Sequence, residues 1–157
     1  MSISSKEPIR VDQSYTMRLI VKYLTSNKWS VVFSDFSHSS RGGYGDKGRV
    51  FELLESLMSP TPDIIATKNS EIHFVEVDGS AGAVSDSLSY YKDHSERILS
   101  EFSSLLRIKL DKLSCGFGRY GIIKDQATIT KNARKEIGDV VVYTVDSNTD
   151  LQVASTF

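Results

Sequence analysis

The spacing of hydrophobic residues along the chain changes between a helical and a strand period, and these changes predict the elements. Residues 12–26 place Met17, Ile20 and Leu24 on one helical face, after a polar start that suits a helix cap. The segment 139–146, "DVVVYTVD", is the clearest strand. Read in the same way, the remaining pattern predicts strands at 29–36, 63–67, 72–78, 115–125 and 151–155, and helices at 48–58, 82–107 and 128–137.

This order of elements is typical of an α/β protein. A helix and a strand come first, followed by an inserted helix, two strands, a helix, a strand, a helix and a final strand pair. We therefore expect a mixed β-sheet flanked by helices. A chain of 157 residues suits one domain, 1–157, in which residues 1–11 form a flexible lead.

Composition and charge narrow the class of protein. The net charge is −1, so bulk positive charge does not hold a nucleic acid. The charges are unevenly distributed, because residues 50–101 carry ten acidic against three basic side chains, whereas 107–135 carry two against eight. That asymmetry suits a metal site beside a surface that binds a polyanion. Chance clustering of surface charges is the alternative interpretation.

The single cysteine and the apolar runs indicate a compartment. Cys115 cannot form a disulfide within the chain, and we expect it to be a buried core residue. The apolar runs are too short for a membrane span, and "MSISSKEPIR" lacks the apolar core of a signal peptide. We expect an intracellular, reducing, cytoplasmic location and no membrane partner.

Three carboxylates stand at the ends of the predicted strand pair 63–67 and 72–78. Glu76 and Asp78 point to one face of their strand, since side chains alternate with a period of two. In a hairpin, Asp63 lies beside that end of the partner strand. Three acids so close together raise each other's pKa, and a divalent cation relieves the repulsion. The alternative is that Asp63 caps a turn while Glu76 and Asp78 face solvent.

The motif that these acids form resembles a known family. "PD", then thirteen residues from Asp63 to Glu76, then "VEVD" is similar to the signature of the PD-(D/E)xK nuclease superfamily. The likeness covers most of residues 12–146. It implies the restriction-endonuclease-like fold, an α/β arrangement with an αβββαβ core, here with an inserted helix. It also implies a metal-dependent endonuclease that hydrolyses DNA phosphodiester bonds in restriction or repair.

The resemblance assigns roles to individual residues. Asp63 and Glu76 match the metal ligands of the family, and the ion is Mg²⁺ or Mn²⁺. Asp78 stands where the family usually has a lysine, so we expect it to assist the metal or hold a second ion. Lys92, beside the buried stripe of the next helix, is the candidate for a relocated catalytic lysine. Glu52 and Glu55 on the inserted helix are candidates for one additional acid.

Basic residues in two other segments suit contacts with phosphates. The glycine-rich loop 37–48 is followed closely by Arg49 and contains three further candidates, Arg41, Tyr44 and Lys47. Arg119 and Lys124 are candidates in the C-terminal third. A solvated face is the alternative for all of them. The expected partner is DNA, with RNA as the alternative, and a homodimer or a subunit of a larger complex suits a chain of this size.

Three other interpretations stay open. The acid at position 78 favours a catalytically inactive nuclease-fold protein that binds nucleic acid or a protein partner. His38, upstream of the acids, resembles the arrangement in RNA endonucleases of the cap-snatching type. A generic α/β interaction domain with incidental acids is the third. His73 and His94 are expected to be packing or surface residues.

Overall fold

The computed structural model of the protein describes residues 9–35 and 61–157. Several predictions fall outside these ranges: residues 1–8 of the lead, the loop 37–48 and the inserted helix 48–58. The candidate residues His38, Arg41, Tyr44, Lys47, Arg49, Glu52 and Glu55 therefore lie outside the described residues.

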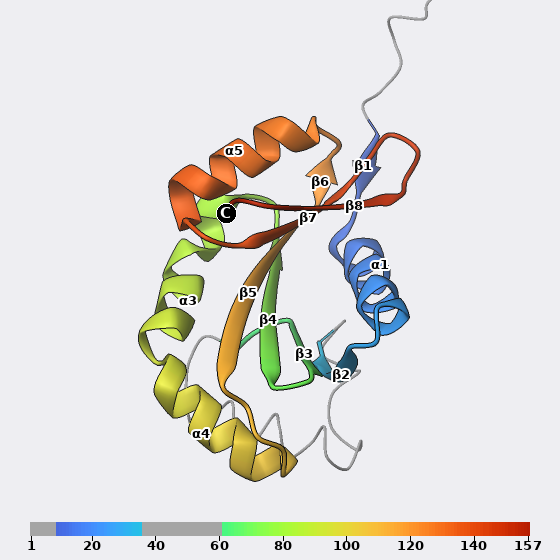
Figure 1. Cartoon of the computed structure of the whole chain (residues 1–157). Coiled ribbons are helices and arrows are strands. Elements are labelled where there is room, and N and C mark those ends of the chain that lie inside the picture. Colours follow the sequence, from blue (N-terminus) through green and yellow to red (C-terminus); the bar gives the residue numbers. More distant parts are fainter. Residues whose placement is uncertain (1–8, 36–60) are drawn as a thin grey trace, which may run out of the picture.

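The described residues form a mixed six-stranded sheet between two layers of helices, which confirms the predicted α/β arrangement (Figure 1). The strand order is β2-β3-β4-β5-β7-β8; β4, β5 and β7 are parallel, and the other pairs are antiparallel. The strands are β2 (Ser30–Ser34), β3 (Ile64–Lys68), β4 (Glu71–Asp78), β5 (Lys112–Arg119), β7 (Val141–Val145) and β8 (Leu151–Ser155).

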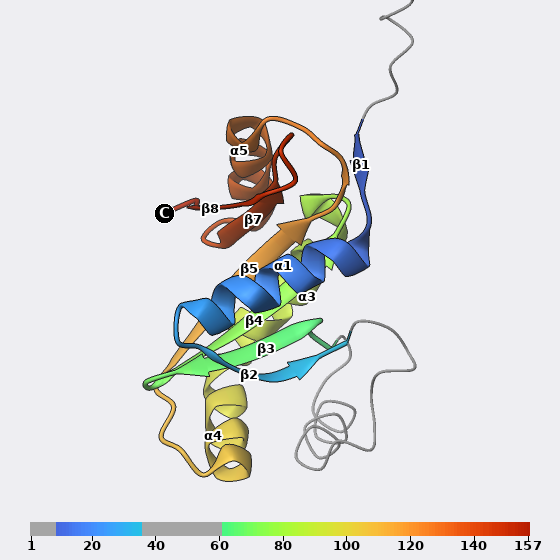
Figure 2. The ribbon, with the colours of Figure 1, turned by 90° about the vertical axis from the view of Figure 1, so that its right-hand side faces the viewer.

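One helix covers one face of the sheet, and three cover the other (Figures 1 and 2). The first face is covered by α1 (Gln13–Ser26), and the second by α3 (Ala81–Asp93), α4 (Ser95–Leu106) and α5 (Gln126–Ile137). Each layer encloses its own apolar cluster, one around Ile20 and Val75 and the other around Phe74 and Phe102. Among the described residues, none of the helices combines the length and apolar character needed to cross a membrane.

The first helix lies where the sequence predicts it. Asp12 caps α1 by accepting a hydrogen bond from the Tyr15 amide at 2.8 Å. Met17, Ile20 and Leu24 are buried against the sheet, as their spacing indicates.

The last residues of the predicted N-terminal lead form a strand. Arg10–Val11 form strand β1, which pairs with β6 (Gly121–Ile122) in a small separate sheet. Val11 is buried, and the Ile9 carbonyl accepts from the Ile123 amide at 3.0 Å. The prediction of a flexible segment reaching residue 11 is therefore wrong, because the β5–α5 connection supplies a backbone partner that the local sequence does not reveal.

The predicted single helix 82–107 is two helices that meet at His94. The ψ angle of His94 is 21°, outside the helical range, and its ring Nδ1 lies 2.9 Å from the Tyr90 carbonyl oxygen. The rings of His94 and Tyr90 also stack, with their centroids 4.0 Å apart. The apolar stripe continues across this break, since Leu88, Ile98 and Phe102 are all buried on the same side, and periodicity alone does not reveal the break.

The predicted strand 115–125 is also divided. Strand β5 begins at Lys112 and ends at Arg119, and the chain then turns through Gly121, whose φ is +116°, into β6. A side chain is strained at that angle, so glycine permits the turn. Helix α5 begins two residues earlier than predicted, because Asp125 accepts from the Thr128 amide and acts as its cap.

Candidate functional site

Three acids lie side by side at one end of the sheet, on the face that α3 covers. The β3–β4 register pairs Ile64 with Val75, which puts Asp63 next to Glu76. The β2–β3 register pairs Ser34 with Ile64, and the Asp35 amide then donates to the Asp63 carbonyl at 2.9 Å. Asp35, Asp63 and Glu76 therefore form a row across three neighbouring strands, which we call the acid row.

Asp63 is held by the backbone of the neighbouring strand. Its Oδ2 accepts a hydrogen bond from the Val77 amide at 2.8 Å, and its own amide donates to the Val75 carbonyl at 3.0 Å. These two contacts fix the carboxyl beside the end of β4. The predicted convergence of Asp63 with Glu76 is thus present in the structure.

Glu76 is buried, with 8% of its surface exposed, and receives a hydrogen bond from a residue that sequence reasoning missed. The hydroxyl of Tyr91, which is fully buried on α3, donates to Glu76 Oε2 at 2.5 Å. The Tyr91 ring packs edge-on against Phe74, with centroids 5.1 Å apart. A tyrosine in a buried helical stripe was the available signal, since a buried tyrosine hydroxyl normally has a polar partner.

Burial sets the electrostatics of the acid row. Burial raises the pKa of Asp63 to about 6. The hydrogen bond from the Val77 amide acts in the opposite direction, because it favours the charged form. Burial and the neighbouring Asp63 charge raise the pKa of Glu76 to about 8. A side-chain hydrogen bond between the two favours an ionised Asp63 and a protonated Glu76. The pair therefore holds a proton near neutral pH.

Asp35 is a second residue that sequence reasoning missed. Its negative charge contributes to the raised pKa of Asp63, and its Oδ1 is buried without a hydrogen-bond partner within residues 9–35 and 61–157. Burying a carboxylate oxygen without a hydrogen-bond partner costs free energy, so this oxygen needs an explanation. "SDF" at the end of a predicted strand was the only signal, and it does not reveal which strand residue faces Asp63.

Asp78 is the last residue of β4, two residues after Glu76 and on the same face of the strand, and it stabilises the turn that follows. Its Oδ1 accepts from the Gly79 amide at 2.6 Å, and its carbonyl accepts from the Tyr120 amide at 3.1 Å. Its charge still raises the pKa of both Asp63 and Glu76. Asp78 therefore borders the acid row and adds to its negative potential.

Lys92 points elsewhere. Its ammonium donates to the Asp139 carbonyl at 2.9 Å, before strand β7. Its charge affects the pKa of Cys115 but is not among the causes that shift Asp63 or Glu76. Tyr91, one residue earlier on α3, is the side chain that this helix directs to the acids. The structure therefore does not bring Lys92 together with the acid row.

The other described candidates are also placed. Arg119 and Lys124 line one cavity of about 490 Å³ beside the start of α3. Cys115 is a buried free thiol, as predicted, and burial raises its pKa to about 11. The predicted packing role of His94 is confirmed by its stacking on Tyr90.

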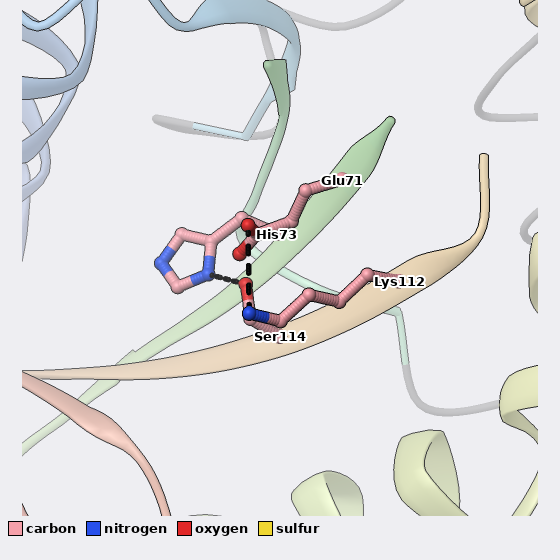
Figure 3. A network of polar contacts seen from close by, with 4 residues as sticks. All are labelled: Glu71, His73, Lys112 and Ser114. Atoms are coloured by element: carbon pink, nitrogen blue, oxygen red, sulfur yellow. Dashed lines mark hydrogen bonds and ion pairs between the residues drawn. The ribbon is translucent and has the colours of Figure 1, made fainter. Parts of the chain in front are cut away.

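His73 belongs to a closed polar network on the opposite face of β4. Its Nδ1 lies 2.7 Å from Ser114 Oγ, and its Nε2 lies 2.8 Å from the Tyr143 hydroxyl. Figure 3 shows the His73–Ser114 contact, with the Glu71–Lys112 ion pair of 3.9 Å beside it. Burial lowers the pKa of His73 to about 4, so it is neutral at pH 7. Its predicted packing role is confirmed.

No three His, Cys, Asp or Glu side chains within residues 9–35 and 61–157 are already arranged as a set of metal ligands. Comparisons with protein-family models, with curated proteins and with solved structures find no match for this chain. The functional assignment therefore depends on the geometry of the acid row.

Proposed function

We propose that the protein is a metal-dependent endonuclease that hydrolyses DNA phosphodiester bonds. The observation that carries this proposal is the pair of adjacent carboxyls, the half-buried Asp63 before β3 and the buried Glu76 on the paired strand β4. Strongly perturbed acids that share a proton are typical of functional sites, because a purely structural site seldom retains such repulsion.

The acid row supplies the oxygen ligands that a divalent cation prefers, although its side chains would have to move to bind one together. Asp63 and Glu76 would hold Mg²⁺ or Mn²⁺ through oxygen atoms, and Asp35 Oδ1, beside Asp63, is a buried oxygen without a partner among the described residues. Asp78 adds negative charge at the rim. When bound, such an ion polarises a phosphodiester and lowers the pKa of water.

The residues of this chain would orient that chemistry. The Val77 amide fixes Asp63, and the Tyr91 hydroxyl fixes Glu76. Burial raises the pKa of Tyr91, so it stays protonated and remains a donor. A proton held between Asp63 and Glu76 must leave before both can act as ligands, which makes metal binding stronger at higher pH.

The arrangement of elements also supports the restriction-endonuclease-like fold. In chain order α1, β2, β3, β4, α3 and β5 follow the αβββαβ pattern, with the antiparallel strands first and β5 parallel to β4. Asp63 directly precedes β3 and Glu76 lies on β4, in keeping with the PD-(D/E)xK resemblance. Asp78, in place of the usual lysine, is the departure from that pattern.

The test is cleavage of supercoiled plasmid DNA with Mg²⁺ or Mn²⁺. Wild-type protein should nick the plasmid. Asp63→Asn and Glu76→Gln each remove a proposed metal ligand. Their cleavage activity should therefore fall at least as far as it does when an outer-shell partner of a metal is removed, which is roughly 10–100-fold. The control is Glu101→Gln, an exposed acid on α4, which should cleave normally. A parallel single-stranded RNA substrate tests the alternative nucleic acid. Absence of metal-dependent cleavage of both substrates by wild-type protein would refute the enzyme assignment.

A second candidate is an inactive nuclease-fold protein that binds nucleic acid or a protein partner. The position of Lys92 favours it, since its ammonium contacts the Asp139 carbonyl, and Asp78 occupies the usual lysine position. In that case wild-type protein and Glu76→Gln bind a labelled duplex equally in EDTA, and neither cleaves it with Mn²⁺.

A further inference from the structure

A cavity of about 490 Å³ opens beside the acid row, over β5 and away from Asp35. Its walls come from the start of α3, the end of β5 and α5. Phe117 lines it, and Phe117 is the register partner of Glu76 on β5. Because neighbouring strands lie about 4.8 Å apart, the cavity begins one strand away from the candidate metal ligands.

Two cationic side chains line this cavity from different elements. Arg119 is the register partner of Asp78 at the end of β5, and Lys124 lies just before α5. The Arg119 guanidinium donates to the Ile122 carbonyl, which anchors it and leaves other N–H donors. Asn132 adds a neutral polar group, and Glu136 is the one acid among the lining residues.

The third wall is the first turn of α3. Ser80, Ala81 and Gly82 line the cavity, and Ser80 is the N-cap residue but makes no side-chain cap hydrogen bond. The amides of a first turn lack partners within the helix and carry partial positive charge. Cations on β5 and before α5 thus face a helix start across an open cavity, a combination that suits an oxyanion.

We propose that this cavity is a phosphate-binding pocket, which holds the backbone phosphate next to the one at the acid row. The identity of the ligand as a nucleic-acid strand rests on the proposed function, whereas anion binding in the cavity does not. Together, the pocket and the acid row would bind two successive phosphates of one strand and set the position of the cleaved bond.

The first test measures binding without metal. In EDTA, inorganic phosphate should shift the backbone amide NMR signals of Ala81 and Gly82, and a fluorescent single-stranded DNA hexanucleotide should bind by anisotropy. The double variant Arg119→Gln/Lys124→Gln should weaken hexanucleotide binding by about tenfold, as for the loss of two phosphate contacts. The matched control, Lys131→Gln/Arg134→Gln, removes the same charge from exposed residues that line a different cavity. It should change affinity by less than about threefold.

A second variant avoids damage to the fold. Asp is as good an N-cap residue as Ser, so Ser80→Asp should leave thermal stability unchanged or higher. Its carboxylate would stand at the cavity and repel phosphate. We expect loss of the phosphate-dependent NMR shifts and at least a fivefold weaker hexanucleotide complex.

The outcomes separate the pocket from the nuclease proposal. If the two double variants weaken binding equally, or Ser80→Asp binds phosphate normally, the pocket is refuted even when wild-type protein cleaves DNA. If wild-type protein never cleaves DNA but the charge variants and Ser80→Asp behave as expected, the pocket stands and only the nuclease proposal fails.

Discussion

Strand β4 carries two buried polar clusters, three residues apart and on opposite faces, and they differ in how completely their atoms are paired. Around His73, both ring nitrogens have partners. Around Glu76, one acid shares a proton with another, and Asp35 Oδ1 has no partner in the part of the chain that the structure describes. A closed network stabilises a fold, whereas an unpaired cluster of like charges costs stability. The first cluster therefore has the character of a structural network, and the contrast supports our proposal that the second is the functional site.

The largest expected effect on stability comes from opening the closed cluster. His73→Ala removes a buried ring and leaves the Ser114 and Tyr143 hydroxyls without that partner. The free energy of unfolding should fall by about 3 kcal/mol. Glu76→Gln should instead raise it by about 1 kcal/mol at pH 8, because a neutral amide replaces a buried acid. Urea unfolding without metal measures the free energy of unfolding of both variants. If both variants lose the same stability, the two clusters do not differ as we infer.

The pH dependence of stability should have opposite signs for the two clusters. Asp63 and Glu76 have raised pKa values, so the folded state binds more protons, and stability is lost as pH rises from about 4 to about 8. His73 has a lowered pKa, so its contribution is lost as pH falls from about 6.5 to about 4.

Urea unfolding at pH 5, 6.5 and 8 in EDTA separates these slopes. The free energy of unfolding of wild-type protein should fall between pH 5 and pH 8. In Glu76→Gln this fall should be smaller by about 2 kcal/mol. Saturating Mn²⁺ should reduce the same loss in wild-type protein, since an ion favours the ionised acids. Identical pH profiles for wild-type protein and Glu76→Gln would show that Glu76 is not perturbed.

A glycine beside the closed cluster gives the next test. A Cβ on Gly116 would lie 2.8 Å from Tyr143 Cε2 and 2.9 Å from His73 Nε2. Gly116→Ala should therefore displace both rings and cost about 2 kcal/mol of unfolding free energy. The matched control is Gly79→Ala, whose Cβ would meet, among the described residues, only the Tyr120 carbonyl oxygen, at 3.9 Å. If Gly116→Ala is as stable as this control, the network is looser than its distances indicate.

Tyr91→Phe should have a smaller effect on stability and a specific effect on the acids. It removes one hydroxyl and leaves Glu76 Oε2 without that donor, at a cost of about 1 kcal/mol. Because the hydrogen bond lowers the pKa of Glu76, its loss should raise that pKa further. Carbon-detected NMR titration of the glutamate carboxyl measures this shift. No shift would mean that Tyr91 does not orient Glu76.

Lys92→Met should have the smallest effect. Lys92 is exposed and donates to one backbone carbonyl, so we expect a change of less than about 0.5 kcal/mol in unfolding free energy. Because its ammonium contacts the Asp139 carbonyl and not the acid row, we also expect normal plasmid cleavage by this variant. A loss of more than tenfold would show that Lys92 is the relocated lysine after all.

The sequence predicted the features that depend on neighbouring residues. Alternation predicted the β3–β4 hairpin, and the spacing of Asp63 and Glu76 predicted that they meet. It did not predict features that depend on rotation or register between distant segments. The direction of Lys92 depends on how α3 lies on the sheet. The sequence also did not distinguish Tyr91, which donates to Glu76, from the apolar residues of the same helical stripe. The pairing of β1 with β6 joins segments more than a hundred residues apart.

The bulge in β2 has a consequence for how such a site changes during evolution. The register moves from Val31–Ala66 to Phe33–Ile65, so Val32 is one extra residue in the strand. With regular pairing, Ser34 would stand opposite Asp63, and Asp35 would fall one place beyond it. Pairing Val32 with Ile65 would therefore exchange an acid for a hydroxyl in the row without substituting any residue, whereas deleting Val32 would keep Asp35 opposite Asp63. The bulge in β2, as much as its composition, determines which chemistry the sheet presents.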